Sequence, residues 1–162
     1  MIQRIQTVYL LLTTILAFVC TVSQLAFYTS GDEMVATFNN FAFNTYEGFK
    51  GYQSAGPFAL GILLIMVIVL SLMSIMLFRK RMRQLRLVII SNILLFGYML
   101  TYVVFAYFYS ENLTLAYPNE AAVTFHLRFA SVMPVLCFLL NCLAIHGIRK
   151  DEALIRSLDR LR

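Results

Sequence analysis

Charged residues are scarce in this sequence. Asp, Glu, Lys and Arg make up 13% of its 162 residues, whereas they make up about 25% of a typical soluble domain. Hydrophobic residues account for 60%, and the mean hydropathy is +0.78. This composition argues against a water-soluble globular domain.

Residues from which active sites are commonly built are also few. Three cysteines, Cys20, Cys137 and Cys142, all fall in apolar runs and form no C-x-x-C pair, which argues against a membrane thiol oxidoreductase. The two histidines, His126 and His146, are separated by an apolar run, so they cannot share a metal ion. There is no glycine-rich phosphate loop, nucleophile elbow or cluster of carboxylates. We therefore expect no enzymatic activity, no metal and no cofactor.

What the sequence does contain is four long apolar runs without a charged residue. A helix rises about 1.5 Å per residue and the hydrocarbon core is about 30 Å thick, so each run can cross a bilayer. Backbone polar groups in lipid must be hydrogen-bonded internally, which favours helices. We predict an all-α membrane protein in which the whole chain forms a single four-transmembrane-helix bundle. The spans are expected at 5–28, 55–78, 87–109 and 129–148.

An alternative for the first run is a secretory signal peptide. Only Arg4 precedes this run, its apolar stretch is longer than usual, and no A-x-A-like cleavage site follows. We therefore expect an uncleaved anchor.

Basic residues indicate how these helices are oriented. All but two of the 13 Lys and Arg residues fall before the first run, in the connection 79–86, or in the tail 149–162; the exceptions are Lys50 and Arg128. Cytoplasmic loops carry an excess of Lys and Arg. Both termini and 79–86 are therefore predicted to be cytoplasmic, and 29–54 and 110–128 external. We expect the basic side to meet anionic inner-leaflet headgroups, with no role in binding nucleic acid.

The first external loop carries β-branched and aromatic residues on both sides of Asn39 and Asn40. Asparagine tolerates positive φ, so this pair suits a hairpin turn. We predict a small β-hairpin here, lying on the helix ends or on a partner because an isolated hairpin is marginally stable. The alternative is a semi-ordered loop whose aromatic residues dip into the membrane interface.

The second external loop ends in YPNEAAVTFHLR (117–128). Its Pro-Asn pair and the following Glu120 suit the first turn of a helix. We predict that the fourth helix begins outside the membrane and carries His126 and Arg128 at the interface. Pro134, deeper in this run, is expected to kink the helix.

An aromatic stripe is predicted on the third helix. Tyr98, Tyr102, Phe105 and Tyr109 recur at steps of four, three and four, so they share one helix face. Together with His126 and Arg128, they form a candidate interaction or ligand surface for a quinone, a lipid tail or a partner helix. The alternative is interhelical packing combined with an aromatic belt at the outer interface.

Two further sets of residues are assigned structural roles. Asn92 and Asn141, in the third and fourth runs, are expected to make interhelical hydrogen bonds. In the tail, leucines recur at helical spacing, which predicts an amphipathic cytoplasmic C-terminal helix. This helix is expected to lie on the inner leaflet or to dock under the bundle or a partner. Its docking residues are Leu154, Leu158 and Leu161.

Both ends of the chain resemble a known family. MIQRIQTVYLLL at the start and IRKDEALIRSLDRLR at the end are similar to the ends of small bacterial inner-membrane proteins catalogued as domain of unknown function 4293. The resemblance implies four spans, cytoplasmic termini and a bacterial plasma membrane. It brings no activity and no catalytic residue.

Three functions are compatible with these features. We expect a non-enzymatic inner-membrane protein that serves as an accessory or assembly subunit of a larger envelope complex and binds other membrane proteins. The alternative is a carrier or binding protein for a neutral or lipid-like small molecule. A third hypothesis is a membrane enzyme that acts on lipid through Glu120, His126 and Arg128.

Overall fold

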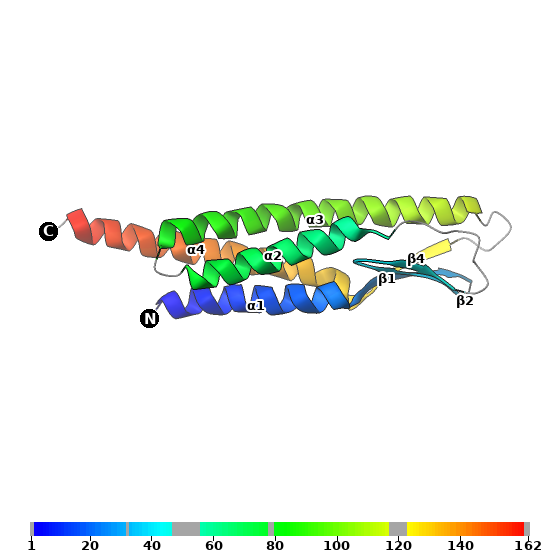
Figure 1. Ribbon diagram of the computed structural model, residues 1–162, viewed down its shortest axis with the longest axis horizontal. Helices are drawn as coiled ribbons and strands as arrows, with labels where there is room; N and C mark the ends of the chain where they lie inside the picture. The colour runs from blue at the N-terminus through cyan, green and yellow to red at the C-terminus, as the bar shows by residue number, and fades with distance from the viewer. Residues whose placement is uncertain (1, 32, 47–55, 78–79, 117–122, 161–162) are drawn as a thin grey trace.

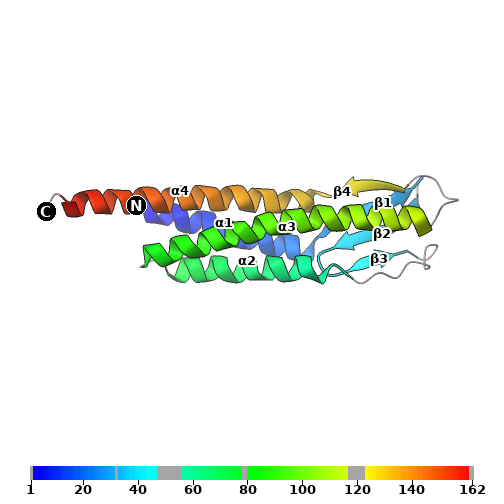
Figure 2. The same ribbon diagram turned by 90° about the horizontal axis from the view of Figure 1, so that it is seen from above.

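The computed structural model describes residues 2–31, 33–46, 56–77, 80–116 and 123–160, with the backbone alone for 2–4 and 155–160. Four long helices run side by side, and a small sheet stands at one end of them (Figure 1, Figure 2). Both chain termini lie at the other end, which we call the termini end. The helices are α1 (Ile2–Val22), α2 (Phe58–Met76), α3 (Arg81–Ala116) and α4 (Met133–Arg160).

Packing of the four helices follows a coiled-coil pattern. In each helix the buried residues recur at alternating steps of three and four, which keeps one seam facing the partner helices and gives left-handed supercoiled bundles. Neighbours in the bundle are α1 with α2 and α4, and α3 with α2 and α4. The seam residues are Gln6, Leu10, Thr13, Ala17 and Cys20; Leu60, Leu64, Val67, Ser71 and Ser74; Gln84, Val88, Ser91, Leu95 and Tyr98; and Pro134, Cys137, Asn141, Ala144, Ile148 and Asp151.

The prediction of four long apolar helices is confirmed, because all four are long and apolar enough to cross a membrane. Their ends differ from the prediction. Helix α1 ends at Val22, α3 already begins at Arg81 and continues to Ala116, and α4 runs on without interruption to Arg160. The tail is therefore the end of α4 and not a separate helix.

A four-stranded antiparallel sheet caps the bundle. Its strands are β1 (Gln24–Ser30), β2 (Glu33–Asn39), β3 (Phe43–Thr45) and β4 (Val123–Leu127), in the order β3-β2-β1-β4. Gly31, with a φ of 60°, connects β1 to β2, a conformation that glycine adopts without steric cost. The expectation of an all-helical chain with at most a hairpin is therefore too narrow.

The predicted hairpin around Asn39 and Asn40 is present as β2 and β3. Phe38 lies opposite Phe43, and the Asn39 N–H donates to the Ala42 carbonyl at 2.9 Å. No described non-glycine residue has a positive φ, so the turn does not use the left-handed conformation that asparagine tolerates.

Two strands replace segments that were predicted to be helical. β1 occupies the end of the first apolar run, and β4 occupies part of the expected start of the fourth helix. They pair with each other, with Phe27 opposite His126. A short apolar segment suits a strand as well as a helix, and pairing between distant segments decides in favour of the strand here.

Pro134 does not kink the middle of the fourth helix. A 3-10 turn, η1, spans Phe129–Val132, and α4 begins at Met133. Pro134 thus lies in the first turn of α4, where the missing N–H would have no intrahelical partner in any case.

Candidate functional site

Stacked aromatic rings fasten the sheet to α3. Phe38 of β2 stacks on Tyr102 with ring centroids 5.6 Å apart, and Phe43 of β3 stacks on Tyr109 at 4.2 Å. Phe105 stacks on Tyr109 at 5.8 Å within the same helix. Because α3 continues beside the sheet (Figure 1), its aromatic side chains can contact both β2 and β3.

Tyr28 of β1 adds a polar attachment to α3. Its hydroxyl donates to the Ala106 carbonyl at 3.0 Å, and its ring lies 5.2 Å from that of Phe125. The Tyr28 side chain is fully buried. Burial raises the pKa of Tyr28 above its ordinary value, and the nearby Tyr102 and Tyr109 add smaller effects in the same direction.

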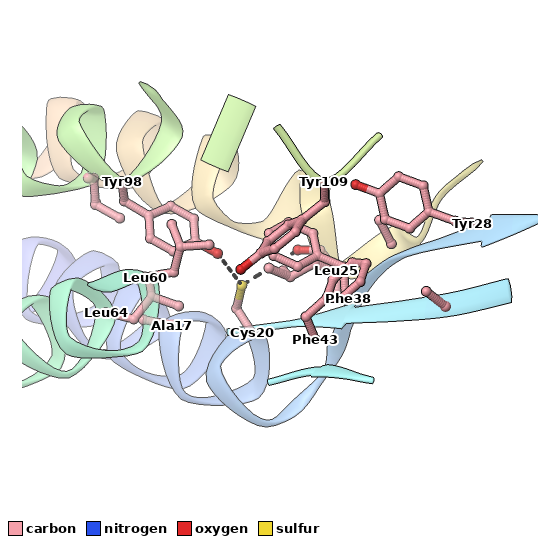
Figure 3. Packing of buried hydrophobic residues seen from close by; sticks show 14 of the residues in the cluster. Ala17, Cys20, Leu25, Tyr28, Phe38, Phe43, Leu60, Leu64, Tyr98 and Tyr109 are labelled. Atoms are coloured by element: carbon pink, nitrogen blue, oxygen red, sulfur yellow. Dashed lines mark hydrogen bonds between the residues drawn. The ribbon is translucent and has the colours of Figure 1, made fainter. Parts of the chain in front are cut away.

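Asn40 ties the sheet to three helices. Its side-chain amide donates to the Cys20 carbonyl of α1 at 2.7 Å, and its Oδ1 accepts from the Tyr98 hydroxyl of α3 at 2.8 Å. Its backbone carbonyl accepts from the N–H of Gly61 in α2 at 3.1 Å. The Cys20 thiol donates to the Ala130 carbonyl at 3.6 Å and lies 3.9 Å from the Tyr98 hydroxyl (Figure 3). The Tyr98 hydroxyl and the Asn40 side-chain amide are thus hydrogen-bonded within the protein.

A second junction joins β1, η1 and α3 through Ser131. Its hydroxyl donates to the Leu25 carbonyl and lies 3.1 Å from the Tyr102 hydroxyl. The Leu25 carbonyl also accepts from the Arg128 N–H at 3.0 Å. The two junctions thus attach the sheet to the helices at β1 and at the turn between β2 and β3.

The side of β1 and β4 that faces away from α3 carries a small aromatic and polar cluster. The rings of Phe27 and His126 stack at 5.0 Å, and the Arg128 guanidinium lies 5.2 Å from the Phe27 centroid. The His126 Nε2 is 3.1 Å from the hydroxyls of Thr29 and Thr124, which are 2.7 Å apart. The predicted site residues His126 and Arg128 therefore both lie beside Phe27, His126 on β4 and Arg128 directly after it, and not on a helix.

An apolar groove of about 260 Å³ opens between α3 and the start of α4. Its polar side-chain atoms belong to Tyr98, Tyr102 and Ser131, which already hydrogen-bond to protein partners. The groove therefore suits an alkyl chain or an apolar side chain. It is lined by Tyr98, Met99, Tyr102, Val103, Leu127, Ser131, Val132, Pro134 and Val135.

The aromatic stripe on α3 is largely internal. Tyr98 and Tyr109 are buried, and Tyr102 and Phe105 pack against the core of the bundle and sheet. Only Tyr98 and Tyr102 of these residues reach the groove. Most of the stripe is therefore not a free surface, because the sheet and the core of the bundle cover it.

Asn92 and Asn141 both bridge α3 and α4. The Asn92 amide donates to the Cys142 sulfur at 3.4 Å, and the Asn141 amide donates to the Ser91 hydroxyl at 3.3 Å. Their Oδ1 atoms are buried without a hydrogen-bond partner among the described residues. Asn92 also lines a second apolar groove of about 260 Å³ between these helices.

At the termini end, α4 is anchored by a contact that the sequence interpretation missed. The Gln6 amide donates to the Asp151 carboxylate at 2.8 Å, and both side chains are buried. Leu154, a predicted docking residue, is about half exposed. The Leu158 side chain and Leu161 lie outside the described residues. Gln6 and Asp151 occupy seam positions of α1 and α4. The alternating steps of three and four along each helix are the sequence signal from which their burial could have been predicted.

Among the described residues, no group of three His, Cys, Asp or Glu side chains could hold a metal ion. The arrangement is one of packing and hydrogen bonding around a fixed sheet. In comparisons with known proteins, the profile of a family described as "Domain of unknown function (DUF4293)" matches residues 2–161. No curated protein matches the chain.

Proposed function

The chain belongs to the DUF4293 family, and we propose that it is a non-enzymatic, multi-pass protein of the bacterial inner membrane that serves as an accessory or assembly subunit of a larger envelope complex. One observation carries the proposal. The sheet is held rigidly on the bundle, yet its edge strand leaves Leu127 63% exposed and is followed by Phe129, 75% exposed. A rigid platform with exposed apolar residues suits the binding of another protein.

Membrane insertion is supported by the outward faces of the helices. Large apolar side chains are about half exposed on every helix, for example Ile15, Ile65, Phe96 and Leu139. Such a surface is unfavourable in water and suited to lipid. In this proposal the four helices are transmembrane spans.

Orientation is supported by the basic residues. Arg83, Arg86, Arg149 and Lys150 belong to parts of α3 and α4 near the termini end (Figure 1). By the positive-inside rule this end is cytoplasmic, and its cations meet anionic lipid headgroups. The sheet is then external.

A matched pair of cysteine variants tests the orientation. Met82, on α3 at the termini end, and Met34, on β2, are both about half exposed. In whole cells a membrane-impermeant thiol reagent should label Met34→Cys and not Met82→Cys, while lysed cells should label both. Wild type supplies the background from its own cysteines. Labelling of Met82→Cys in intact cells would show that the orientation is the reverse of the one proposed.

Gentle extraction in detergent tests the role as a subunit. We expect the tagged chain to migrate in a particle that contains other proteins and exceeds its own 18.6 kDa plus the detergent micelle. Crosslinking in intact cells before extraction should retain the same neighbours. Recovery of the chain alone in both experiments would refute this function.

The second candidate is a carrier or binding protein for a neutral or lipid-like molecule, and the groove between α3 and α4 favours it. Val103 lines this groove, whereas the adjacent Val104 does not, although they are 63% and 65% exposed. If this function is correct, Val103→Trp should reduce the amount of co-purifying lipid-like molecule measured by mass spectrometry, and Val104→Trp should not. Equal effects would refute it.

A further inference from the structure

The strand β4 leaves one backbone edge open. Its register with β1 places Arg128 opposite Leu25, and the Arg128 N–H donates to the Leu25 carbonyl. In an antiparallel ladder, residues alternate between pointing their N–H and C=O toward the partner and away from it. The backbone N–H and C=O groups of His126 and Thr124 therefore point toward β1, and those of Phe125 and Leu127 point away from it. Among the described residues no backbone group pairs with this outward edge.

The side chains of β4 on the side of α3 and the groove are apolar and exposed. Phe125 is exposed although its ring contacts Tyr28, and Leu127 is exposed beside the groove. An open edge with apolar side chains is a template for another strand, and proteins usually protect such edges with charges, prolines or bulges. Within β4 no such protection is present, since its residues are Val, Thr, Phe, His and Leu.

The groove adjoins the end of β4, where Leu127 lines it. Strand addition combines hydrogen bonds to an exposed edge with pockets that accept alternate side chains. Leu127 belongs to both features, because its backbone forms the edge and its side chain lines the groove. The space of about 260 Å³ can receive an apolar side chain from the added strand.

The side of β4 that faces away from α3 offers a positive charge to an added strand. Arg128 directly follows β4 and lies over the Phe27 ring on the side away from α3. Arg128 makes no ion pair with another described residue. An acidic side chain on this side of an added strand would find a cation there, and such complementarity fixes register more than it adds affinity.

We infer that β4 binds an extended segment of a different membrane protein by strand addition, with apolar side chains facing α3 and the groove and an acidic side chain near Arg128. This inference rests on the proposed function and names the kind of partner. The segment belongs at the outer end of a membrane span, at the level of β4.

A second copy of this chain does not meet the geometry. Antiparallel strands are related by a twofold axis perpendicular to them, and β4 runs along the bundle (Figure 2). That axis would turn the second bundle end for end, which two copies with one orientation in one bilayer cannot satisfy. A twofold axis along the strand would make the two β4 strands parallel and set Phe125 opposite Phe125. In a parallel ladder, a residue whose N–H and C=O point toward the partner strand lies opposite one whose groups point away, so this arrangement cannot form the ladder.

Site-specific photocrosslinking in intact cells tests the partner. A photoreactive phenylalanine analogue is placed at position 125 or 127, and at Tyr46, just past β3 at the opposite edge of the sheet, as the control. We expect adducts from 125 and 127 with neighbouring residues of one extended segment, and none with that segment from 46. Adducts with a second copy, with lipid alone or with nothing would overturn the inference, as would equal capture from 46.

Backbone-selective variants test the edge itself. Phe125→Pro removes an outward N–H while leaving the β1 ladder unbroken, and Phe125→Ala removes the same ring but keeps the N–H. With the photoreactive analogue at position 127, recovery of the crosslinked partner should fall about tenfold more for proline than for alanine. With the analogue at position 125, Leu127→Lys, which adds a charge at the edge without changing the backbone, should reproduce the loss even if Phe125→Pro fails to fold.

The two proposals fail in distinguishable ways. If wild type is extracted in a large particle that Phe125→Pro and Leu127→Lys leave intact, the strand-addition inference is refuted and the proposed function stands. If wild type is recovered alone both after extraction and after crosslinking in intact cells, the proposed function is refuted, and the inference with it.

Discussion

Replacement of Asn40 by alanine should strongly destabilise the junction between sheet and helices. The side chain is fully buried and makes hydrogen bonds of 2.7 Å to the Cys20 carbonyl and 2.8 Å from the Tyr98 hydroxyl. Alanine leaves both partners without these bonds. A buried group left unpaired costs about 1–3 kcal/mol, so we expect the free energy of unfolding to fall by about 2–5 kcal/mol.

A double-mutant cycle isolates the bond between Asn40 and Tyr98. Tyr98→Phe alone leaves the Asn40 oxygen without its hydroxyl donor and should cost about 1–3 kcal/mol. In the Asn40→Ala background the hydroxyl has already lost this acceptor, so the same change should cost about 0–1 kcal/mol. The assay is reversible unfolding in mixed micelles, followed by circular dichroism.

Asn92→Ala serves as the control, because the Asn92 amide reaches only a sulfur acceptor at 3.4 Å and should contribute less. If Tyr98→Phe destabilised the protein equally in both backgrounds, the two side chains would not share a bond.

Three further predictions concern other parts of the chain. A Cβ on Gly56 would lie 2.2 Å from the Phe41 carbonyl oxygen, whereas one on Gly97 would meet nothing within 4 Å; Gly56→Ala should therefore lower thermal stability by about 1–3 kcal/mol and Gly97→Ala should not. Burial raises the folded-state pKa of Tyr28, so its contribution to stability is fully present below its ordinary pKa of about 10 and is lost progressively as the pH rises above that value; Tyr28→Phe should therefore make the free energy of unfolding less pH-dependent above about pH 10. Asp151→Leu should cost about 1–3 kcal/mol by leaving a buried amide donor unpaired, and Asp151→Asn, which keeps an acceptor oxygen, should cost less.

The helices could be predicted because their signal is local. Uninterrupted apolar runs with charges at the ends identify them without reference to any neighbour. The finer packing signal was also present, since Gln6, Leu10, Thr13, Ala17 and Cys20 alternate in steps of four and three. Such spacing predicts which face of a helix is buried, including the polar positions.

The sheet could be predicted only in part, because its stability comes from pairing between distant segments. The turn after Asn39 has a local sequence signal and was found. The pairing of Phe27 with His126 joins residues far apart in the chain, and each segment alone is equally compatible with a helix. For the same reason the spacing of Tyr98 and Tyr109 predicted a shared face but not that the sheet covers it.

Helix α3 has a mechanical consequence. Its 36 residues form a rod of about 54 Å at 1.5 Å per residue, longer than the hydrocarbon core of about 30 Å. One end carries Arg81 and Arg83, and the other carries the stacked rings that hold the sheet. If the helices span a bilayer as proposed, a change in bilayer thickness that tilts this rod would swing the sheet through the same angle, and lipid composition would set the angle at which the sheet meets its surroundings.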